Sequence, residues 1–157
     1  MDKIDLILNN DKFKNNLLQN VLLEKDREYC KHDLEHFLSV ARIAYILCLE
    51  EDLKIDKEMI YAASLLHDIG KNVQYEKGIP HEAASVSIAE DILINAGFDE
   101  NEKSDIIEAI KHHRVYDENV FNSLIYRADK LSRNCFNCIK FDECNWNDEE
   151  KNKSIKI

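Results

Sequence analysis

Glycine and proline are scarce in this chain of 157 residues, which contains three glycines and one proline. Runs of β-branched residues, which are typical of strands, are also few. Because glycine and proline interrupt helices, their scarcity predicts an all-α fold. The length is that of one domain, long enough to bury a single sizeable hydrophobic core.

Basic residues are too few to balance the acidic ones. The chain has 21 Lys and Arg against 31 Asp and Glu, which gives a net charge of −10. A negative field of this size disfavours nucleic-acid binding and attracts cations. A small anionic substrate would therefore need metal ions or a local basic patch to be held, and we expect no nucleic-acid partner.

Long hydrophobic runs are also absent. No run approaches the ~20 residues that span a bilayer, and the first five residues lack the basic and apolar regions of a signal peptide. The five cysteines are an odd number, as is usual for reduced thiols in a cytoplasm. We expect a cytoplasmic protein without a membrane partner, and the sequence leaves its oligomeric state open.

The sequence divides into three segments. Residues 1–30 contain a helix, from about Asp11 to Glu24, that packs on the rest of the domain through a stripe of Phe13, Leu17, Leu18 and Val21. Residues 31–133 form the main helical domain. Residues 134–157 are a cysteine-containing tail, and we expect its last ten residues to be frayed.

Four of the six histidines begin or end apolar stripes on four different predicted helices. These helices run from Asp33 to about Asp52, from Lys57 to His67, from Pro80 to about Asn95 and from Asp99 to His113; their histidines are His36, His67, His81 and His113. Periodicity favours His113 over His112 as the inward residue, because apolar residues precede His113 at spacings of three, four and seven. The role of His32, one turn before His36, is left open.

Two carboxylates accompany these histidines. Asp68 follows His67 directly, before Gly70 and a predicted polar loop from Asn72 to Ile79. Asp129 lies at the edge of the apolar face of a last helix, predicted from about Asp117 to Arg133. A single inward histidine is more often structural than a metal ligand, but four histidines and two carboxylates are costly to bury without a shared partner. We therefore predict a metal site inside a helical bundle, with chance placement as the alternative.

Three motifs in this order resemble the HD-domain superfamily of metal-dependent phosphohydrolases. They are HFLSVA at residues 36–41, LLHDIGK at residues 65–71 and ADK at residues 128–130, and the resemblance covers roughly residues 32–133. It implies a single-domain helical bundle of the HD type, with about six or seven helices. It also implies hydrolysis of a phosphate ester or anhydride of a small phosphorylated substrate, with a nucleotide as the expected one.

Two further positions, His81 and His113, are similar to the extra histidines of a six-ligand subgroup that holds two metal ions. This subgroup includes the symmetrical dinucleoside tetraphosphate hydrolases. Those enzymes typically continue with a tyrosine after the last aspartate, whereas here Lys130 follows Asp129. The departure concerns the identity of the substrate rather than the metal site.

The resemblance also implies roles for individual residues. One metal ion would be held by His36, His67, Asp68 and Asp129, and a second by Asp68 as a bridge together with His81 and His113. Imidazole and carboxylate ligands suit iron or manganese, and a hydroxide bridging the two ions would be the nucleophile. Lys71 would act on the phosphoryl group in catalysis and binding and Arg133 in binding, unless both form ordinary surface salt bridges.

Two other functions stay open at this point. Some six-ligand members of the superfamily resemble mixed-valent di-iron oxygenases, and a nucleotide-binding regulator with a silent site is also conceivable. The tail adds a separate question, because Cys135, Cys138 and Cys144 have the spacing C-x2-C-x5-C. Such thiols bind zinc or an iron–sulfur cluster when a fourth ligand is present, and Cys30 is the available thiol; the alternative is three reduced thiols that only pack.

Overall fold

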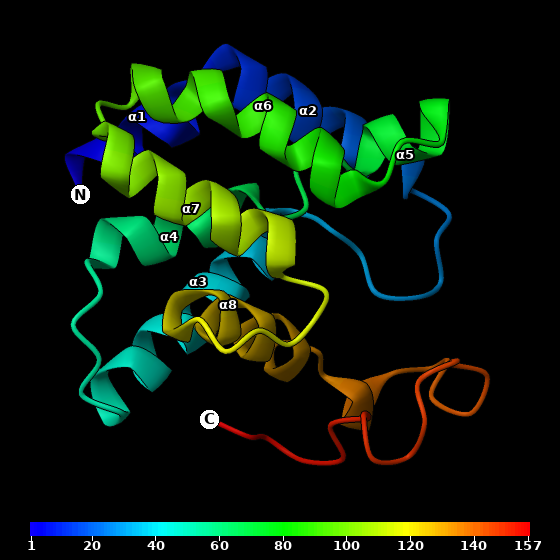
Figure 1. Cartoon of the computed structure of the whole chain (residues 1–157). Helices are drawn as coiled ribbons and strands as arrows, with labels where there is room; N and C mark the ends of the chain where they lie inside the picture. The colour runs from blue at the N-terminus through cyan, green and yellow to red at the C-terminus, as the bar shows by residue number, and fades with distance from the viewer.

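The computed structural model describes residues 1–157 as eight α-helices and one short 3₁₀ turn, without a strand (Figure 1). The elements are α1 (Asp2–Asn9), α2 (Asp11–Leu23), α3 (Leu34–Glu50), α4 (Lys57–Leu66), α5 (Lys71–Lys77), α6 (His81–Asn95), α7 (Glu100–His112), α8 (Val120–Leu131) and η1 (Cys135–Asn137). The predicted all-α fold is confirmed, and the short helices α1 and α5 bring the number of helices to eight. No helix is both long and apolar enough to cross a bilayer.

The helices surround one hydrophobic core. Helix α7 packs against α6 on one side and against α4 and α8 on the other, while α3 contacts both α4 and α8 (Figure 1). The buried apolar side chains form one cluster to which every helix except α5 contributes. A single continuous core of this kind is what one domain of this length is expected to build.

Side-chain caps fix where most helices begin. Asp56 caps α4 and Asp99 caps α7 by accepting hydrogen bonds from free backbone N–H groups of the first turn. Glu102 completes a capping box with Asp99. Asp33 does the same for α3 by accepting from the N–H of His36, which places His36 in the first turn of its helix.

The predicted polar loop from Asn72 to Ile79 is wrong, because most of it forms α5. The backbone N–H of Asn72 donates to Oδ1 of Asn20 at 2.8 Å, and its side-chain amide donates to the carbonyl of Asn16 at 3.0 Å. These bonds attach α5 to α2, and Gly78 ends the helix in the left-handed conformation at φ 70°. Polar contacts therefore stabilise this helix in place of an apolar stripe.

Gly70, between α4 and α5, is required by a close approach of α6. A Cβ atom at this position would lie 2.5 Å from the backbone nitrogen of Ser85. The N–H of Gly70 donates to Oγ of Ser85 at 2.9 Å, which fixes the turn that carries His67 and Asp68 against α6.

The predicted inward face of α2 is partly wrong. Phe13 is buried, but Leu18 and Val21 are 53% and 46% exposed. The inward face instead carries Asn20, whose amide donates to the carbonyl of Asp68 at 3.1 Å, and Glu24 follows at the end of the helix. The helix is thus oriented by polar contacts to the turn after α4.

The last ten residues, expected to be frayed, are held in part: residues 153–157 are exposed, but the two residues before them are not. Lys151 and Asn152 are buried, and the amide of Asn152 donates to the carbonyls of Lys130 and Arg133 at 2.8 and 2.9 Å. These carbonyls lie at the C-terminal end of α8, where helices leave acceptors free. The tail, drawn in orange to red, therefore folds back beside α8 (Figure 1).

Candidate metal centre

The six predicted ligands meet where helix ends converge. His36 lies in the first turn of α3, His81 is the first residue of α6, and His113 directly follows α7. His67 and Asp68 directly follow α4, and Asp129 lies in the last turn of α8. All six side chains are buried, so helix packing alone brings them to one point in the core.

Four of these residues form a first possible ligand group. One donor atom from each of His36, His67, Asp68 and Asp129 lies within 4.8 Å of the others. Nε2 of His67 is 3.2 Å from Oδ2 of Asp68, and Nε2 of His36 is 3.3 Å from Oδ1 of Asp129. Two imidazoles and two carboxylates around one point are a donor set that suits a transition-metal ion.

Asp68 also belongs to a second possible group, with His81 and His113. Its other oxygen, Oδ1, lies 3.0 Å from Nε2 of His81 and 3.5 Å from Nε2 of His113. Nδ1 of His81 is 2.7 Å from Oε1 of Gln74, and its Nε2 points to the centre, 3.2 Å from Nε2 of His113. The two oxygens of Asp68 thus face two separate sets of imidazoles.

Backbone carbonyls orient the rings of His67 and His113, as the Gln74 side chain orients that of His81. Nδ1 of His67 donates to the carbonyl of Ser64 at 2.7 Å, and Nδ1 of His113 donates to that of Ile110 at 2.6 Å. Because a carbonyl only accepts, each Nδ1 carries a proton and each ring is held with its Nε2 facing Asp68. An orienting bond of this kind is what ligating histidines typically have.

The charges of the centre call for a cation. Burial by itself would lower the pKa of His67, but Asp68 and Asp129 raise it to about 10. Burial would raise the pKa values of Asp68 and Asp129, whereas the neighbouring histidines hold both well below the usual range. Nε2 of His67, Oδ1 of Asp68 and Oδ1 of Asp129 are buried without a hydrogen-bond partner. Buried polar atoms without partners fit a bound metal ion, which would take the place of the proton on His67 and satisfy all three atoms together.

The HD domain family model matches residues 33–134, about two thirds of the chain. The chain belongs to the HD domain family. An uncharacterized protein of Clostridium beijerinckii is 50% identical over 155 residues, which cover 99% of each chain. Ribonuclease Y of Thermus thermophilus and that of Syntrophomonas wolfei are each 32% identical over 106 residues, 66% of this chain. The matched segment is only 17% and 19% of those two proteins. No solved structure gives a significant match.

Two basic side chains of this HD domain reach the centre. Nζ of Lys71 lies 4.0 Å from Oδ1 of Asp68, and burial lowers the pKa of Lys71. Arg133 donates to Nε2 of His36 at 3.0 Å and lies 3.7 Å from Oδ1 of Asp129. Both side chains are mostly buried, at 15% and 11% exposed, so neither forms an ordinary surface salt bridge.

His32, whose role the sequence left open, is a fifth buried histidine at the HD centre. Nε2 of His32 lies 3.7 Å from Oδ2 of Asp68, and its Nδ1 bonds to Oε1 of Glu24 at 2.5 Å. Glu24 also accepts from the hydroxyl of Tyr75 and from the backbone N–H of His32. The i, i+4 spacing of His32 and His36 was the available signal for His32. Nothing marked Glu24, which follows a helix assigned only to packing.

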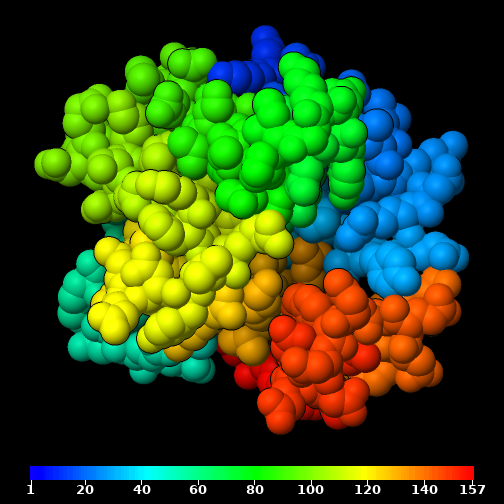
Figure 2. Space-filling view, turned by 45° about the vertical axis from the view of Figure 1, so that its right-hand side comes forward, coloured from blue at the N-terminus to red at the C-terminus, as the bar shows by residue number.

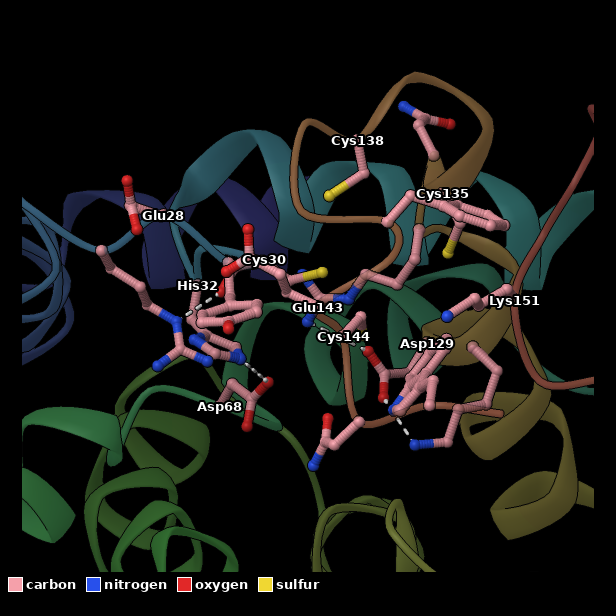
Figure 3. A pocket seen from close by; sticks show the side chains of 18 of the residues that line it. Glu28, Cys30, His32, Asp68, Asp129, Cys135, Cys138, Glu143, Cys144 and Lys151 are labelled. Atoms are coloured by element: carbon pink, nitrogen blue, oxygen red, sulfur yellow. Dashed lines mark hydrogen bonds and ion pairs between the residues drawn. The ribbon is translucent and has the colours of Figure 1, made fainter. Parts of the chain in front are cut away.

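The HD centre forms the floor of a cavity of about 790 Å³. The cavity opens between α6, the loop before α3 and the tail (Figure 2). Six basic side chains line it, namely Arg27, Lys71, Arg114, Lys130, Arg133 and Lys151. Four carboxylates line it as well, and two of these are Asp68 and Asp129, which point toward the floor (Figure 3). A protein of net charge −10 therefore has a basic wall above its candidate metal centre.

Proposed function

We propose that this HD-domain protein is a metal-dependent phosphohydrolase that cleaves an ester or anhydride bond of a small phosphorylated substrate, with a nucleotide as the expected class. The observation that carries the proposal is the position of the two ligand groups, joined by Asp68, at the floor of a basic cavity. A volume of about 790 Å³ lies in the range typical of small-molecule sites.

Two metal ions fit the residues present. His36, His67, Asp68 and Asp129 would hold the first, and Asp68, His81 and His113 the second, with iron or manganese as the expected metals. Bound ions of this kind activate water at neutral pH and stabilise negative charge on phosphoryl oxygens. With this assignment the chain would resemble the six-ligand subgroup of HD proteins, to which the dinucleoside tetraphosphate hydrolases belong.

The protein's own side chains supply binding and orientation. Lys71 and Arg133 lie beside the two ligand groups and would neutralise phosphoryl oxygens there. Arg114 and Lys130 line the same cavity and are available to a second phosphate. Three aromatic residues, Tyr29, Phe141 and Trp146, also line the cavity. Nζ of Lys151 lies 4.7 Å from the ring centre of Phe141 and Nζ of Lys130 lies 5.2 Å from that of Trp146, so a nucleobase would stack on Tyr29 or on the opposite faces of the other two rings. These residues support a nucleotide in preference to a simple phosphate monoester.

Cleavage of an RNA phosphodiester is a second candidate, favoured by the similarity to proteins named Ribonuclease Y. Against it, the net charge of −10 repels a long polyanion, and the matched segment is a small part of those proteins. A short phosphorylated substrate needs only the local basic wall, so we favour it.

The test combines metal analysis with a substrate screen. The purified protein is loaded with manganese or with iron, its metal content is measured, and phosphate release is followed over mononucleotides, dinucleoside polyphosphates and short RNA oligonucleotides. We expect close to two ions per chain and hydrolysis of a nucleotide. His81→Ala should retain one ion and lose activity, and His112→Ala is the matched control on α7.

Three results would contradict this function. Absence of any transition metal under every loading condition would remove the metal centre. Dioxygen consumption by the iron-loaded protein without phosphate release would indicate the oxygenase alternative. Tight nucleotide binding without turnover by the metal-loaded protein would indicate a regulator with a silent site.

A further inference from the structure

Four of the five cysteines line one wall of the cavity, although they come from distant parts of the chain. Cys30 precedes α3, Cys135 begins η1, and Cys138 and Cys144 follow in the tail. All five thiols are free, and no disulfide joins any pair. Figure 3 shows Cys30, Cys135 and Cys138 above Asp68 and Asp129, and Cys144 closer to the level of Asp129.

Polar contacts join the two segments that carry these thiols. Arg133 donates to the carbonyl of Lys31 at 3.0 Å, and Nζ of Lys140 lies 3.1 Å from a carboxylate oxygen of Glu28. The thiols are close enough for their charges to interact. Burial is the largest cause that raises the pKa of Cys30, Arg133 lowers it, and negative charge on the three tail thiols raises it further.

Polar contacts hold the tail, which buries little apolar surface of its own. Its only regular element is the three-residue turn η1, and Ile139 and Phe136 are 87% and 47% exposed. A segment that buries so little apolar surface rarely keeps one conformation without a cross-link. Thiolates converging from two segments are the usual protein means of supplying such a cross-link, through a bound metal.

We propose that Cys30, Cys135, Cys138 and Cys144 bind an iron–sulfur cluster, which fastens the tail across the cavity of the HD domain. Four thiolates also form zinc sites, in which Zn–S bonds of about 2.3 Å bring the sulfurs to about 3.8 Å from one another. No three of these sulfurs lie within 4.8 Å of one another. The ligands of a cluster bind different irons and stand further apart, which fits the looser arrangement of these thiols.

The cluster would connect the tail to the substrate cavity. Trp146 and Lys151 belong to the tail and line that cavity. Both follow Cys144, the last of the thiols, in the sequence. Fixing Cys144 fixes Trp146, two residues later, above the HD centre. The cluster site uses none of the six candidate ligands of that centre, so it stands or falls independently of the phosphohydrolase proposal.

The experiment measures acid-labile sulfide, because only a cluster contains it and iron at the HD centre does not. The full chain is purified anaerobically and, in parallel, reconstituted with ferrous iron and sulfide under reducing conditions. We expect stoichiometric sulfide and broad visible absorption. Cys135→Ala and Cys144→Ala should lose both. Cys48→Ala is the matched control, because Cys48 is buried in α3 and its thiol donates to the carbonyl of Leu53 at 3.4 Å.

A second pair of measurements keeps the test decisive if the cysteine variants do not fold. His81→Ala, altered at the HD centre alone, should keep its sulfide. In the wild-type protein, the four wall thiols should resist alkylation and become reactive together after the cluster is destroyed by acid or chelator. Wild-type protein that gains no sulfide on reconstitution, sulfide that survives both cysteine variants, or stoichiometric zinc on these thiols would each overturn the cluster.

Discussion

Two regions of the molecule direct candidate metal ligands into one cavity, and they differ in what holds those side chains in place. The histidine and aspartate centre is built from helix ends, and the carbonyls of Ser64 and Ile110 orient two of its imidazoles. The cysteine wall is built from a loop and a tail with one short turn. In the first region the folded core positions the ligands before any ion binds; in the second, few contacts other than those to a bound group would do so.

The largest expected effect is at Asp68, where the first region depends on one side chain. Asp68→Ala removes the carboxylate that faces both ligand groups, and turnover should fall by several orders of magnitude, that is by at least ~4 kcal/mol of transition-state stabilisation. The helical signal in circular dichroism should persist, because packing of α4 and α6 holds the turn. Turnover and metal content are measured together. Activity within tenfold of wild type would show that the shared carboxylate is not the link between two ions.

The next largest loss of turnover is expected at His113, and the adjacent His112 provides the comparison. His113 is 1% exposed and its Nε2 faces Asp68, whereas the side chain of His112 is 34% exposed and contacts Glu108. His113→Ala should lose the second ion and reduce turnover more than the ~10–100-fold typical of losing an outer partner of a metal ligand. His112→Ala should stay within a fewfold of wild type. Equal effects of the two changes would contradict the assignment of the second group.

Periodicity made the difference between these two histidines predictable. Helices α3, α4, α6 and α7 each have an apolar stripe, so sequence spacing identifies which histidine faces the core. Helix α2, in contrast, is oriented by polar contacts to residues that are distant in the sequence. Asn20 bonds to the backbone of Asp68 and Asn72, which lie about fifty residues away in the sequence. No local sequence pattern indicates such distant contacts. For this reason the inward face of α2 was predicted partly wrongly, and α5 was predicted as a loop.

The position of the tail was also unpredictable from local sequence patterns. Its position depends on Asn152, whose amide donates to the last carbonyls of α8, and on Arg133, which bonds to the carbonyl of Lys31. Asparagine and arginine near a chain end are usually exposed, so the composition predicted a frayed segment. The cysteine spacing could be seen in the sequence, but the convergence of Cys30 with the tail thiols needed the fold.

A smaller effect, on substrate binding, is expected at Lys71, which lines the cavity beside Asp68. Lys71→Met keeps the length of the side chain and removes its charge, so a phosphate substrate should bind about tenfold more weakly, or about 1.4 kcal/mol. Metal content should not change, because Lys71 belongs to neither ligand group. Steady-state kinetics with metal analysis checks both statements. Arg42→Met, on α3 and outside the cavity, is the matched control; an unchanged KM for every phosphorylated substrate would reduce Lys71 to a structural role.

The smallest effect concerns Glu24, at the border between the two regions. This carboxylate bonds to His32, which lies two residues after Cys30 and 3.7 Å from Asp68. Burial would raise the pKa of Glu24, but hydrogen bonds from His32 and Tyr75 lower it from 4.5 to about 2. A carboxyl whose pKa is lower in the folded state stabilises the fold above its unfolded pKa, and this stabilisation is lost as the pH falls from about 4.5 toward 2.

Glu24→Gln should therefore lower the thermal midpoint at pH 6 by a few degrees, at about 2–4 °C for each kcal/mol lost. The difference from wild type should shrink as the pH falls from about 4.5 toward 2, since Glu24 is then protonated first in the unfolded state and, near pH 2, in the folded state too. Thermal denaturation of both proteins across this range gives the comparison. Glu28→Gln is the control, because Glu28 is exposed and pairs with Lys140 on the tail side. A constant difference between Glu24→Gln and wild type down to pH 2 would show that shape, and not charge, is what Glu24 contributes. The ordering of His32 beside the metal centre would then owe nothing to an ionised carboxylate.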